Sequence, residues 1–541
     1  MKYLIFLLPF LFSNTWAGNQ NIKKPKLVVG IVVDQMRYDY LYKYWDKYQE
    51  GGFKRLLNKG YSFENTHYNY TPTYTGPGHA AIYSGTSPHV NGIVGNNWFD
   101  RNEKRVVYVT EDNSVQSVGG SEKAGQMSPK YLMSTTITDE LEMNTQKRAK
   151  VVGIALKDRG AILPAGHAAD AAYWFDGKTG NFISSSFYVN DLPQWVKNFN
   201  DKKLPDSYLN QTWNTLLPIE KYTESTADDV SWEILFKGKE KPTFPYNLAE
   251  LRKNTDFGLV SKTPFGSTLT LEFALAALEN ENMGKDAICD FLALSFSSPD
   301  YIGHQFGPDA IEVQDNYLRL DLELKRLFDY LDKNVGKNDY LVFLTADHGG
   351  MNTIGYLKDH KIKSGNFEQK RFENELNIVL NKEFGEEKWI ESMENQQIYL
   401  NHELIKAKNI DVEKMSKSII KFSQHFDGVY RVLTSEEIMN NHFETPIVKR
   451  VQNGFYNKRS GDISLILNPG WFDGGENHKG GTTHGSGFAY DTHIPLVFMG
   501  AGIKPGKNIE YSEIIDIAPT IAHILKIMEP SGNTGKILEF E

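Results

Sequence analysis

The chain has only one cysteine among its 541 residues, Cys289, so it can form no disulfide within itself. This cysteine stands in the apolar run DAICDFLALSF, where a buried, unreactive thiol is typical. The chain also lacks an excess of basic residues, because 59 Lys and Arg stand against 68 Asp and Glu, a net charge of −9. This balance argues against nucleic acid as a partner.

Long apolar runs are missing after the first residues of the chain. The N-terminal stretch MKYLIFLLPFLFSNTWA has an apolar run from Tyr3 to Phe12, shorter than the roughly 20 residues that cross a bilayer. It predicts a secretory signal peptide over residues 1–17, cleaved near Ala17. We therefore expect an exported protein without a membrane span. Export without disulfides indicates a bacterial periplasm.

Short runs rich in β-branched residues recur along the chain and end in polar residues. They cover residues 26–34, 150–157, 288–300, 340–348 and 493–500. Because apolar and polar residues do not alternate strictly in them, they predict strands that are buried on both faces. Helical patterns lie between them, over Thr268–Glu279, 311–334 and 513–525. The alternation predicts an α/β fold with a mainly parallel central sheet flanked by helices.

Two segments interrupt this rhythm. Residues 366–480 are charged and mixed in pattern, and we interpret them as an inserted cap region. A stretch at about 171–255, rich in Trp, Pro and Asn, is interpreted as a second elaboration near the site. The α/β core is then expected over residues 24–365 and 481–541.

Acidic residues and histidines follow the predicted strands, at the edge of the sheet where ligands bind in open α/β folds. They are Asp34, Asp300, His304, Asp347, His348 and His484. Each has a plainer interpretation: Asp34 as a strand-end cap, His304 as the helical partner of Asp300, His484 as a loop histidine without a role. Together, mixed Asp and His ligands at one edge suit zinc, and two zinc ions can clamp a phosphoryl group between them.

The stretch TPTYTGPGHAA, residues 71–81, places a hydroxyl where a helix is expected to begin. Pro77 suits the first turn of a helix, so Thr75 is expected at or just before the helix N-terminus. Thr75 is then either a helix cap or a nucleophile that faces an anion at the positive end of the helix. These eleven residues alone favour the cap.

Several short motifs together resemble those of the alkaline phosphatase superfamily. They are VVDQ at 33–36, TGPGH at 75–79, SSPDYIGH at 297–304, TADHGG at 345–350 and GTTHG at 481–485. Two more, LKDRGAILPAGH at 156–167 and GIVGNNW at 92–98, narrow the resemblance to the monomeric periplasmic PafA-type phosphomonoesterases. It covers nearly the whole chain after the predicted signal peptide. Because the phosphomonoesterases that the chain resembles are monomeric, a monomer is expected.

The resemblance implies a site with two Zn²⁺ ions. Asp300, His304 and His484 then hold one ion. Asp34, Asp347 and His348 hold the other, together with the Thr75 oxygen. Thr75 becomes the nucleophile and forms a phosphothreonine, so the resemblance favours attack over capping. His79 is interpreted as a supporting residue and not as a ligand.

Formal charges favour a phosphate monoester as substrate. Two Zn²⁺ ions and three ligand Asp leave one positive charge, which the Thr75 alkoxide cancels, so a monoester dianion needs two further cations. Lys157 and Arg159 supply them, and the resemblance places them on the phosphate oxygens with Asn96 as a hydrogen-bond donor. The plainer interpretation is a solvated turn in which both pair with Asp158.

Two other functions stay open beside a phosphomonoesterase. Phosphodiesterases and nucleotide pyrophosphatases resemble the chain in fold and metal ligands, and a diester, with one negative charge, has less use for both cations. A protein that binds zinc or phosphate without catalysis is the third possibility. A sulfatase is disfavoured, because the turn after Thr75 ends in His79 and not in the Arg of the sulfatase signature.

Overall fold

A sheet of ten strands forms the centre of the protein, and the structure, a computed structural model, describes residues 22–475, 478 and 480–540 of it. The strand order is β22-β2-β21-β13-β1-β12-β7-β8-β9-β6. The predicted signal peptide lies outside the described residues. The five predicted strand runs are all present, as β1 (Leu27–Val33), β7 (Val151–Ala155), β12 (Asp290–Phe296), β13 (Tyr340–Thr345) and β21 (Leu496–Gly500).

The middle of the sheet is parallel and its flanks are mixed. β13, β1, β12, β7 and β8 (Ala171–Asp176) run in the same direction. β21 pairs antiparallel to β13 and to β2 (Tyr61–Phe63), and β9 (Asn181–Ser185) pairs antiparallel to β8. The strands β1, β12 and β13 are buried along their whole length, as the lack of alternation predicts. The remaining edge strands are β22 (Gly506–Asn508) and β6 (Ser117–Val118).

The register of the parallel strands brings their carboxyl ends to one edge. Val33, the last residue of β1, stands opposite Phe296, and Val32 stands opposite Thr345. The residues that follow β1, β12 and β13 therefore start from the same level of the sheet. This is why side chains far apart in the sequence meet there.

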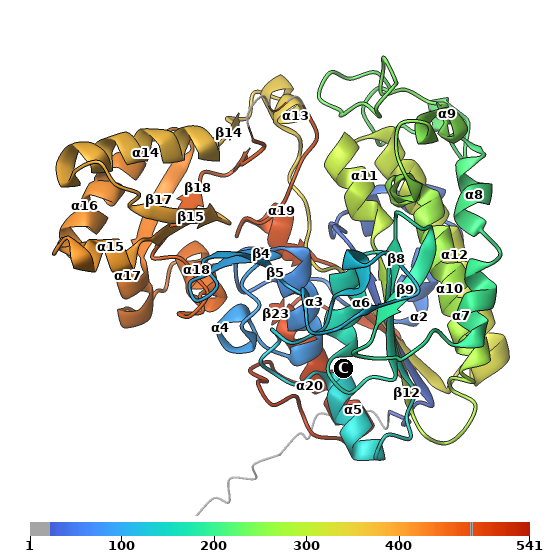
Figure 1. Ribbon diagram of the computed structural model, residues 1–541. Helices are drawn as coiled ribbons and strands as arrows, with labels where there is room; N and C mark the ends of the chain where they lie inside the picture. Colours follow the sequence, from blue (N-terminus) through green and yellow to red (C-terminus); the bar gives the residue numbers. More distant parts are fainter. Residues whose placement is uncertain (1–21, 476–477, 479, 541) are drawn as a thin grey trace, which may run out of the picture.

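Helices cover both faces of the sheet (Figure 1). On one side lie α10 (Pro264–Asn280) and α12 (Ile311–Leu331), and on the other α3 (Thr75–Ser84), α6 (Asp158–Ala165) and α20 (Ile517–Leu525). The helix predicted from residue 311 ends at Leu331 and continues as a π-helical turn, and the one predicted from Thr268 begins at Pro264, four residues earlier. Among the described residues, no helix is both long and apolar enough to cross a bilayer.

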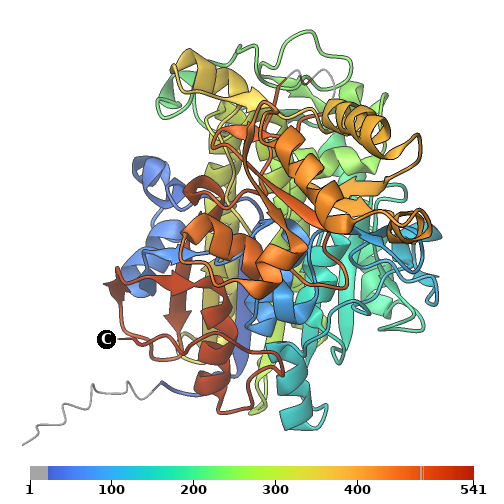
Figure 2. The same ribbon diagram turned by 90° about the vertical axis from the view of Figure 1, so that its left-hand side faces the viewer.

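A separate lobe, here called the cap lobe and taken as residues 369–467, stands beside the sheet (orange in Figures 1 and 2). It contains an antiparallel sheet of β15 (Ile390–Glu394), β16 (Gln397–Leu400), β18 (Ile463–Leu467) and β17 (Val429–Thr434), in that order. The helices α14 (Gln369–Phe384) and α16 (Val412–Ser423) cover this sheet and share an apolar core with it. The domain boundaries themselves stay a prediction. The stretch predicted as an elaboration at about 171–255 begins within the central sheet, in β8 and β9.

Candidate metal centre and active site

The first group of possible metal ligands consists of Asp34, Asp347 and His348. Asp34 follows β1, and Asp347 and His348 follow β13, so the parallel register brings them together. Their ligand atoms lie within 4.8 Å of one another, and all three residues are buried. His348 donates from Nδ1 to the Gly349 carbonyl at 2.8 Å, which leaves the Nε2 lone pair turned toward Asp34 Oδ1 at 3.4 Å.

The polar atoms of this group fit a cation. Asp34 Oδ1, Asp347 Oδ2 and His348 Nε2 are buried and have no hydrogen-bond partner among the described residues, while Asp34 Oδ2 pairs with Lys157 Nζ at 2.6 Å. Burial raises the pKa of Asp34 to about 6 and that of Asp347 well above its ordinary value, and it lowers the pKa of His348. Buried polar atoms without partners are costly in a folded protein. A bound divalent metal ion would satisfy the three unpartnered atoms at once.

The second group consists of Asp300, His304 and His484. Asp300 and His304 lie one turn apart on α11 (Ser298–Phe306), and His304 Nε2 is 3.2 Å from Asp300 Oδ1. His484 Nε2 is 3.5 Å from the same oxygen. Both histidines use Nδ1 on a backbone carbonyl, that of Thr482 at 2.8 Å and that of Thr73 at 2.7 Å, so both direct Nε2 at the carboxylate. The helical pairing of Asp300 with His304 is therefore present and belongs to the group.

The two groups are in contact with each other. The rings of His348 and His484 are stacked with 3.4 Å between their centroids, one from each group. Gln35, next to Asp34, donates its backbone N–H to Asp347 and its side-chain Nε2 to Asp300, at 3.1 and 2.8 Å. All six Asp and His residues collected at the predicted strand ends thus meet in one place.

Thr75 is the first residue of α3, and Tyr74 precedes it as the N-cap. The prediction that Thr75 lies at a helix N-terminus is confirmed. The N-cap residue is Tyr74, and Asn96 Oδ1 accepts from the Gly76 N–H in the first turn, so the capping role first considered for the Thr75 hydroxyl is not the one it has. The start of the helix lies close against the first group, because a Cβ at Gly78 would be only 2.3 Å from the Asp347 carbonyl oxygen. The positive end of the helix dipole faces this part of the site.

His79 supports Thr75 from within the helix. Its Nδ1 donates to the Thr75 carbonyl at 2.9 Å, and its Nε2 contacts Ser295 Oγ at 2.8 Å. Burial lowers the pKa of His79 to about 3, so the ring is neutral and Nε2 accepts. The short motif TGPGH gives a hint of this role, since it places a histidine one helical turn after Thr75.

Lys157, predicted on the phosphate oxygens, lies between the two acidic groups. Its Nζ is 2.6 Å from Asp34 Oδ2, 2.5 Å from Asp300 Oδ2 and 3.4 Å from Thr75 Oγ1. The Lys157 ammonium is therefore the cationic partner of both carboxylates. Burial by itself would raise the pKa of Asp300, but the positive charges of His304 and Lys157 hold this pKa well below its ordinary value. The plainer interpretation of Lys157 as part of a solvated turn is wrong, because the residue is buried.

Arg159 and Asn96 have free donors in the described structure. Arg159 donates from Nη1 to the Tyr108 hydroxyl at 2.9 Å, while its buried Nε has no partner among the described residues. Asp158 does not pair with Arg159 but accepts from Tyr108 at 2.7 Å. Asn96 accepts from the Gly76 N–H through Oδ1 at 2.8 Å. Its Nδ2 donors take no part in this hydrogen bond. Nothing in the sequence around Tyr108 signals its contact with Arg159.

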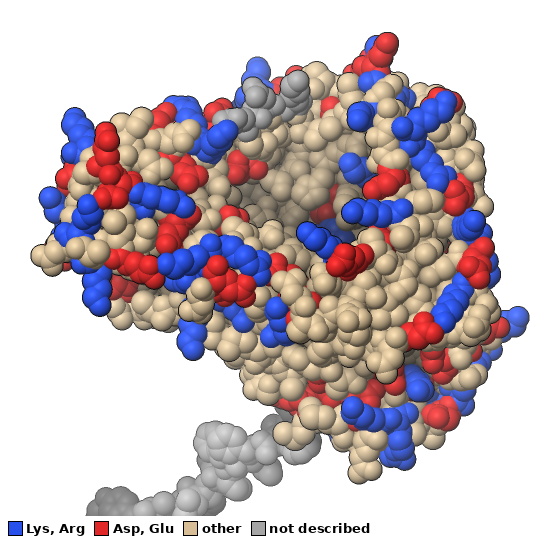
Figure 3. Space-filling view, viewed as in Figure 1, with Lys and Arg blue, Asp and Glu red and all other residues tan. Residues whose placement is uncertain are grey.

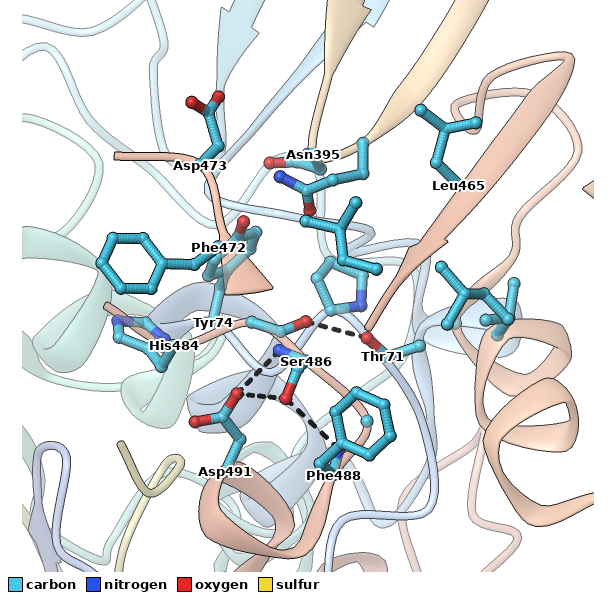
Figure 4. A pocket seen from close by; sticks show the side chains of 18 of the residues that line it. Thr71, Tyr74, Asn395, Leu465, Phe472, Asp473, His484, Ser486, Phe488 and Asp491 are labelled. Carbon is cyan, nitrogen blue, oxygen red and sulfur yellow. Dashed lines mark hydrogen bonds between the residues drawn. The ribbon is translucent and has the colours of Figure 1, made fainter. Parts of the chain in front are cut away.

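The site faces a hollow between the cap lobe and the α/β core (Figure 3). Beside it, a cavity of about 120 Å³ is bounded by the cap lobe on one side and by the loop that carries His484 on the other (Figure 4). Tyr74 and His484 line this cavity together with aromatic residues such as Phe472 and Phe488. The stretch at about 171–255 also reaches the site, since the Ile234 N–H donates to the Gln305 carbonyl, next to His304, at 2.8 Å.

Comparisons with known proteins agree with this geometry. The family model of type I phosphodiesterase / nucleotide pyrophosphatase matches residues 28–487. A Myroides odoratus protein named calcium-transporting ATPase is 50% identical, over 97% of this chain and 96% of its own. Alkaline phosphatase PafA from Elizabethkingia meningoseptica is 46% identical, over 98% and 97%. A crystal structure of wild-type alkaline phosphatase PafA superposes with a TM-score of 0.92 at 47% identity, covering 95% of this chain and 98% of that one.

Proposed function

The chain belongs to the alkaline phosphatase superfamily, and on that premise we propose that it hydrolyses phosphate monoesters with Thr75 as the nucleophile. The observation that carries this proposal is the meeting of two Asp/His groups at the N-terminus of α3, with His348 and His484 stacked between them. The phosphomonoesterase activity follows from the relatives that are 46% identical over nearly the whole chain. The residue roles below are our assignment.

Zinc is the metal we assign to both groups. The donors are three carboxylates and three imidazoles, a mixed set that suits zinc better than the all-oxygen sets of magnesium or calcium. Asp34, Asp347 and His348 would hold one ion, and Asp300, His304 and His484 the other. When bound, such ions lower the pKa of a nearby hydroxyl and stabilise the negative charge of a leaving oxygen.

The reaction proceeds in two displacements at phosphorus. Thr75 Oγ1 gives up its proton and attacks, the new Thr75–phosphate bond forms, and the bond to the alcohol breaks with the electron pair leaving on the alcohol oxygen, which takes up a proton. Water then attacks the phosphothreonine, the threonine oxygen leaves and takes up a proton from that water, and inorganic phosphate is released. Lys157, Arg159 and Asn96 orient the phosphoryl oxygens in both steps.

Arg159 gives the site its preference for a dianion. Among the described residues it donates from Nη1 alone, so a phosphate oxygen can accept from the rest of the half-buried guanidinium without displacing a protein contact. Lys157 Nζ, 3.4 Å from Thr75 Oγ1, is close enough to contact both the nucleophile and the group it attacks. Two cations beside a neutralised metal site match the two negative charges of a monoester.

A parallel assay tests this function. The protein is stripped with a chelator, reloaded with zinc, and assayed with 4-nitrophenyl phosphate and bis(4-nitrophenyl) phosphate. We expect monoester turnover to return with zinc and to exceed diester turnover. Faster diester hydrolysis would support the alternative, a phosphodiesterase or nucleotide pyrophosphatase, the activities that the description of the family model names. Release of no phosphate at all would indicate a protein that only binds it.

We also propose that the enzyme works in the bacterial periplasm as a monomer. The location rests on the N-terminal apolar run and on the single cysteine, which is buried. Cell fractionation with antibody detection tests it, and recovery with the cytoplasmic fraction would contradict it. Light scattering of the purified protein tests the monomer.

A further inference from the structure

The cap lobe reaches the active site through the tip of one hairpin. β15 and β16 are joined by the two residues Asn395 and Gln396, whose φ angles are +54° and +58°. Positive φ at both central residues defines a type I′ turn, for which Asn followed by Gly is the favoured sequence. A glutamine at the second position is unfavourable for the backbone, since it has a Cβ where glycine has none. Such an exception points to a use for the side chain.

Asn395 contacts the first residue of the strand that follows Asn96. Its Nδ2 donates to the Asn97 carbonyl at 2.7 Å. The two segments are packed closely, because a Cβ at Gly95 would lie 2.5 Å from the same Nδ2. Asn97 begins β4 (Asn97–Asp100), directly after Asn96, and Asn96 accepts from the Gly76 N–H at 2.8 Å. A short chain of contacts therefore runs from the cap lobe through Asn96 to the first turn of α3.

Gln396 lies on the same cavity as the residue before Thr75, which is Tyr74. The Gln396 side chain opposes the rise in the pKa of Tyr74 that burial causes. Both residues line the cavity beside the site, in which Figure 4 shows Tyr74 below the turn at Asn395. The Gln396 carbonyl accepts from the Leu465 N–H at 2.8 Å, so the turn is fixed to the cap sheet. Tyr74 is the N-cap of α3, and its placement sets where the helix begins.

We propose that Asn395 and Gln396 are positioning residues, through which the cap lobe holds Asn96 and Thr75 in the geometry that the reaction needs. This inference rests on the proposed function, because Asn96 and Thr75 are assigned by it. The turn does not touch the reacting atoms. It acts one residue away from them, at the Asn97 carbonyl next to Asn96 and in the cavity lined by Tyr74 next to Thr75.

A turn that only closed the hairpin would behave differently on substitution. Replacing Gln396 with glycine relieves the unfavourable backbone conformation, so hairpin stability is kept or improved. If the side chain positions Tyr74, the same change lowers activity. A gain in stability combined with a loss of activity separates positioning from a purely structural role.

The experiment uses the zinc-loaded full chain and two variants, Gln396→Gly and Asn395→Asp. Asn395→Asp keeps a residue that tolerates positive φ but removes the donor to the Asn97 carbonyl. We expect both to lower kcat/KM for 4-nitrophenyl phosphate by about 3- to 10-fold, the factor of one neutral hydrogen bond. Asn395→Asp also raises the inhibition constant of inorganic phosphate, since Asn96 binds phosphate less well. The melting temperature of Gln396→Gly equals or exceeds that of the wild type.

Matched controls come from the same chain. Asn409 lies in the cap lobe with φ +52° and Gln146 follows α5 (Ile137–Thr145) with φ +54°, and both are exposed. Asn409→Asp and Gln146→Gly repeat the two substitutions in the same backbone conformation away from the site. We expect them to keep wild-type kcat/KM. A loss in the controls as large as in the variants would overturn the inference.

A double-mutant cycle decides whether Asn395 acts through Asn96. In an Asn96→Ala background, Asn395→Asp is expected to change kcat/KM by less than about twofold, because the group it positions is absent. The same loss in both backgrounds would overturn the assignment, as would wild-type kcat/KM in both single variants. If the wild-type enzyme released no phosphate from monoesters, the proposed function would fail instead, before any variant was compared.

Discussion

The substitution Arg159→Ala should separate monoesters from diesters. A monoester dianion carries one negative charge more than a diester, so it loses more when a cation beside the phosphate is removed. Arg159 is half-buried, and its Nε has no partner among the described residues, so neighbouring side chains compensate little for its loss. The excess loss is the interaction of the guanidinium with that additional charge.

The size of this excess loss follows from the Coulomb interaction between the Arg159 guanidinium and the additional charge of the monoester. At a separation of about 5 Å and an effective dielectric constant of about 20, one unit charge contributes about 3 kcal/mol. The value of kcat/KM for the monoester should therefore fall roughly 150-fold further than that for the diester. Tyr108→Phe, which removes only the hydroxyl that accepts from Arg159 Nη1 at 2.9 Å, should cost about 3- to 10-fold with the monoester.

The assay measures initial rates with 4-nitrophenyl phosphate and bis(4-nitrophenyl) phosphate at equal metal content. Arg431→Ala, an exposed arginine on β17 of the cap lobe, is the matched control and should leave both rates unchanged. Equal losses with the two substrates would refute the charge argument, because they would show that Arg159 does not sense the additional charge of the monoester.

Three further results are expected. His79→Ala should lower kcat about 10-fold at unchanged metal content, because the imidazole that donates to the Thr75 carbonyl is lost. Steady-state kinetics combined with metal analysis tests this prediction, and a wild-type kcat would count against it. Chelation should lower the melting temperature, because a metal at a free concentration of about 100 times its Kd contributes about 2.7 kcal/mol to the free energy of unfolding. Readdition of zinc should reverse the shift. An unchanged melting curve would argue against metal at these buried groups. Burial raises the pKa of Glu312 from 4.5 to about 8, so the folded protein keeps a proton that the unfolded chain loses, and stability falls as pH rises from about 4.5 through about 8. Glu312→Gln should lessen this fall in urea unfolding at several pH values, and parallel pH profiles of both proteins would contradict it.

Much of the core could be predicted from local sequence. Runs such as KLVVGIVVD lack alternation because β1 is buried on both faces, and this pattern is visible without any tertiary information. The rule that parallel strands end at one edge then brought Asp34, Asp347 and Asp300 together. The position of Thr75 at a helix N-terminus followed from Pro77 in the first turn.

Contacts between distant segments could not be predicted in this way. Tyr108 meets Arg159 because β4 and β5 (Arg105–Tyr108) fold over α6, and neither strand has a motif that signals it. Asn395 reaches Asn97 only because the cap lobe stands against the core. The antiparallel pairing of β21 is decided by the path of the chain after the cap lobe, and the composition of the strand does not encode it.

The central claim is that the Thr75 oxygen attacks phosphorus within this pair of metal groups. The turnover of 4-nitrophenyl phosphate by Thr75→Ala, at a zinc content equal to that of the wild type, tests it most directly. We expect a fall in kcat/KM of at least about 1,000-fold with both metal groups still loaded. Turnover at the wild-type rate would contradict the account, because the reaction would then need no hydroxyl at residue 75.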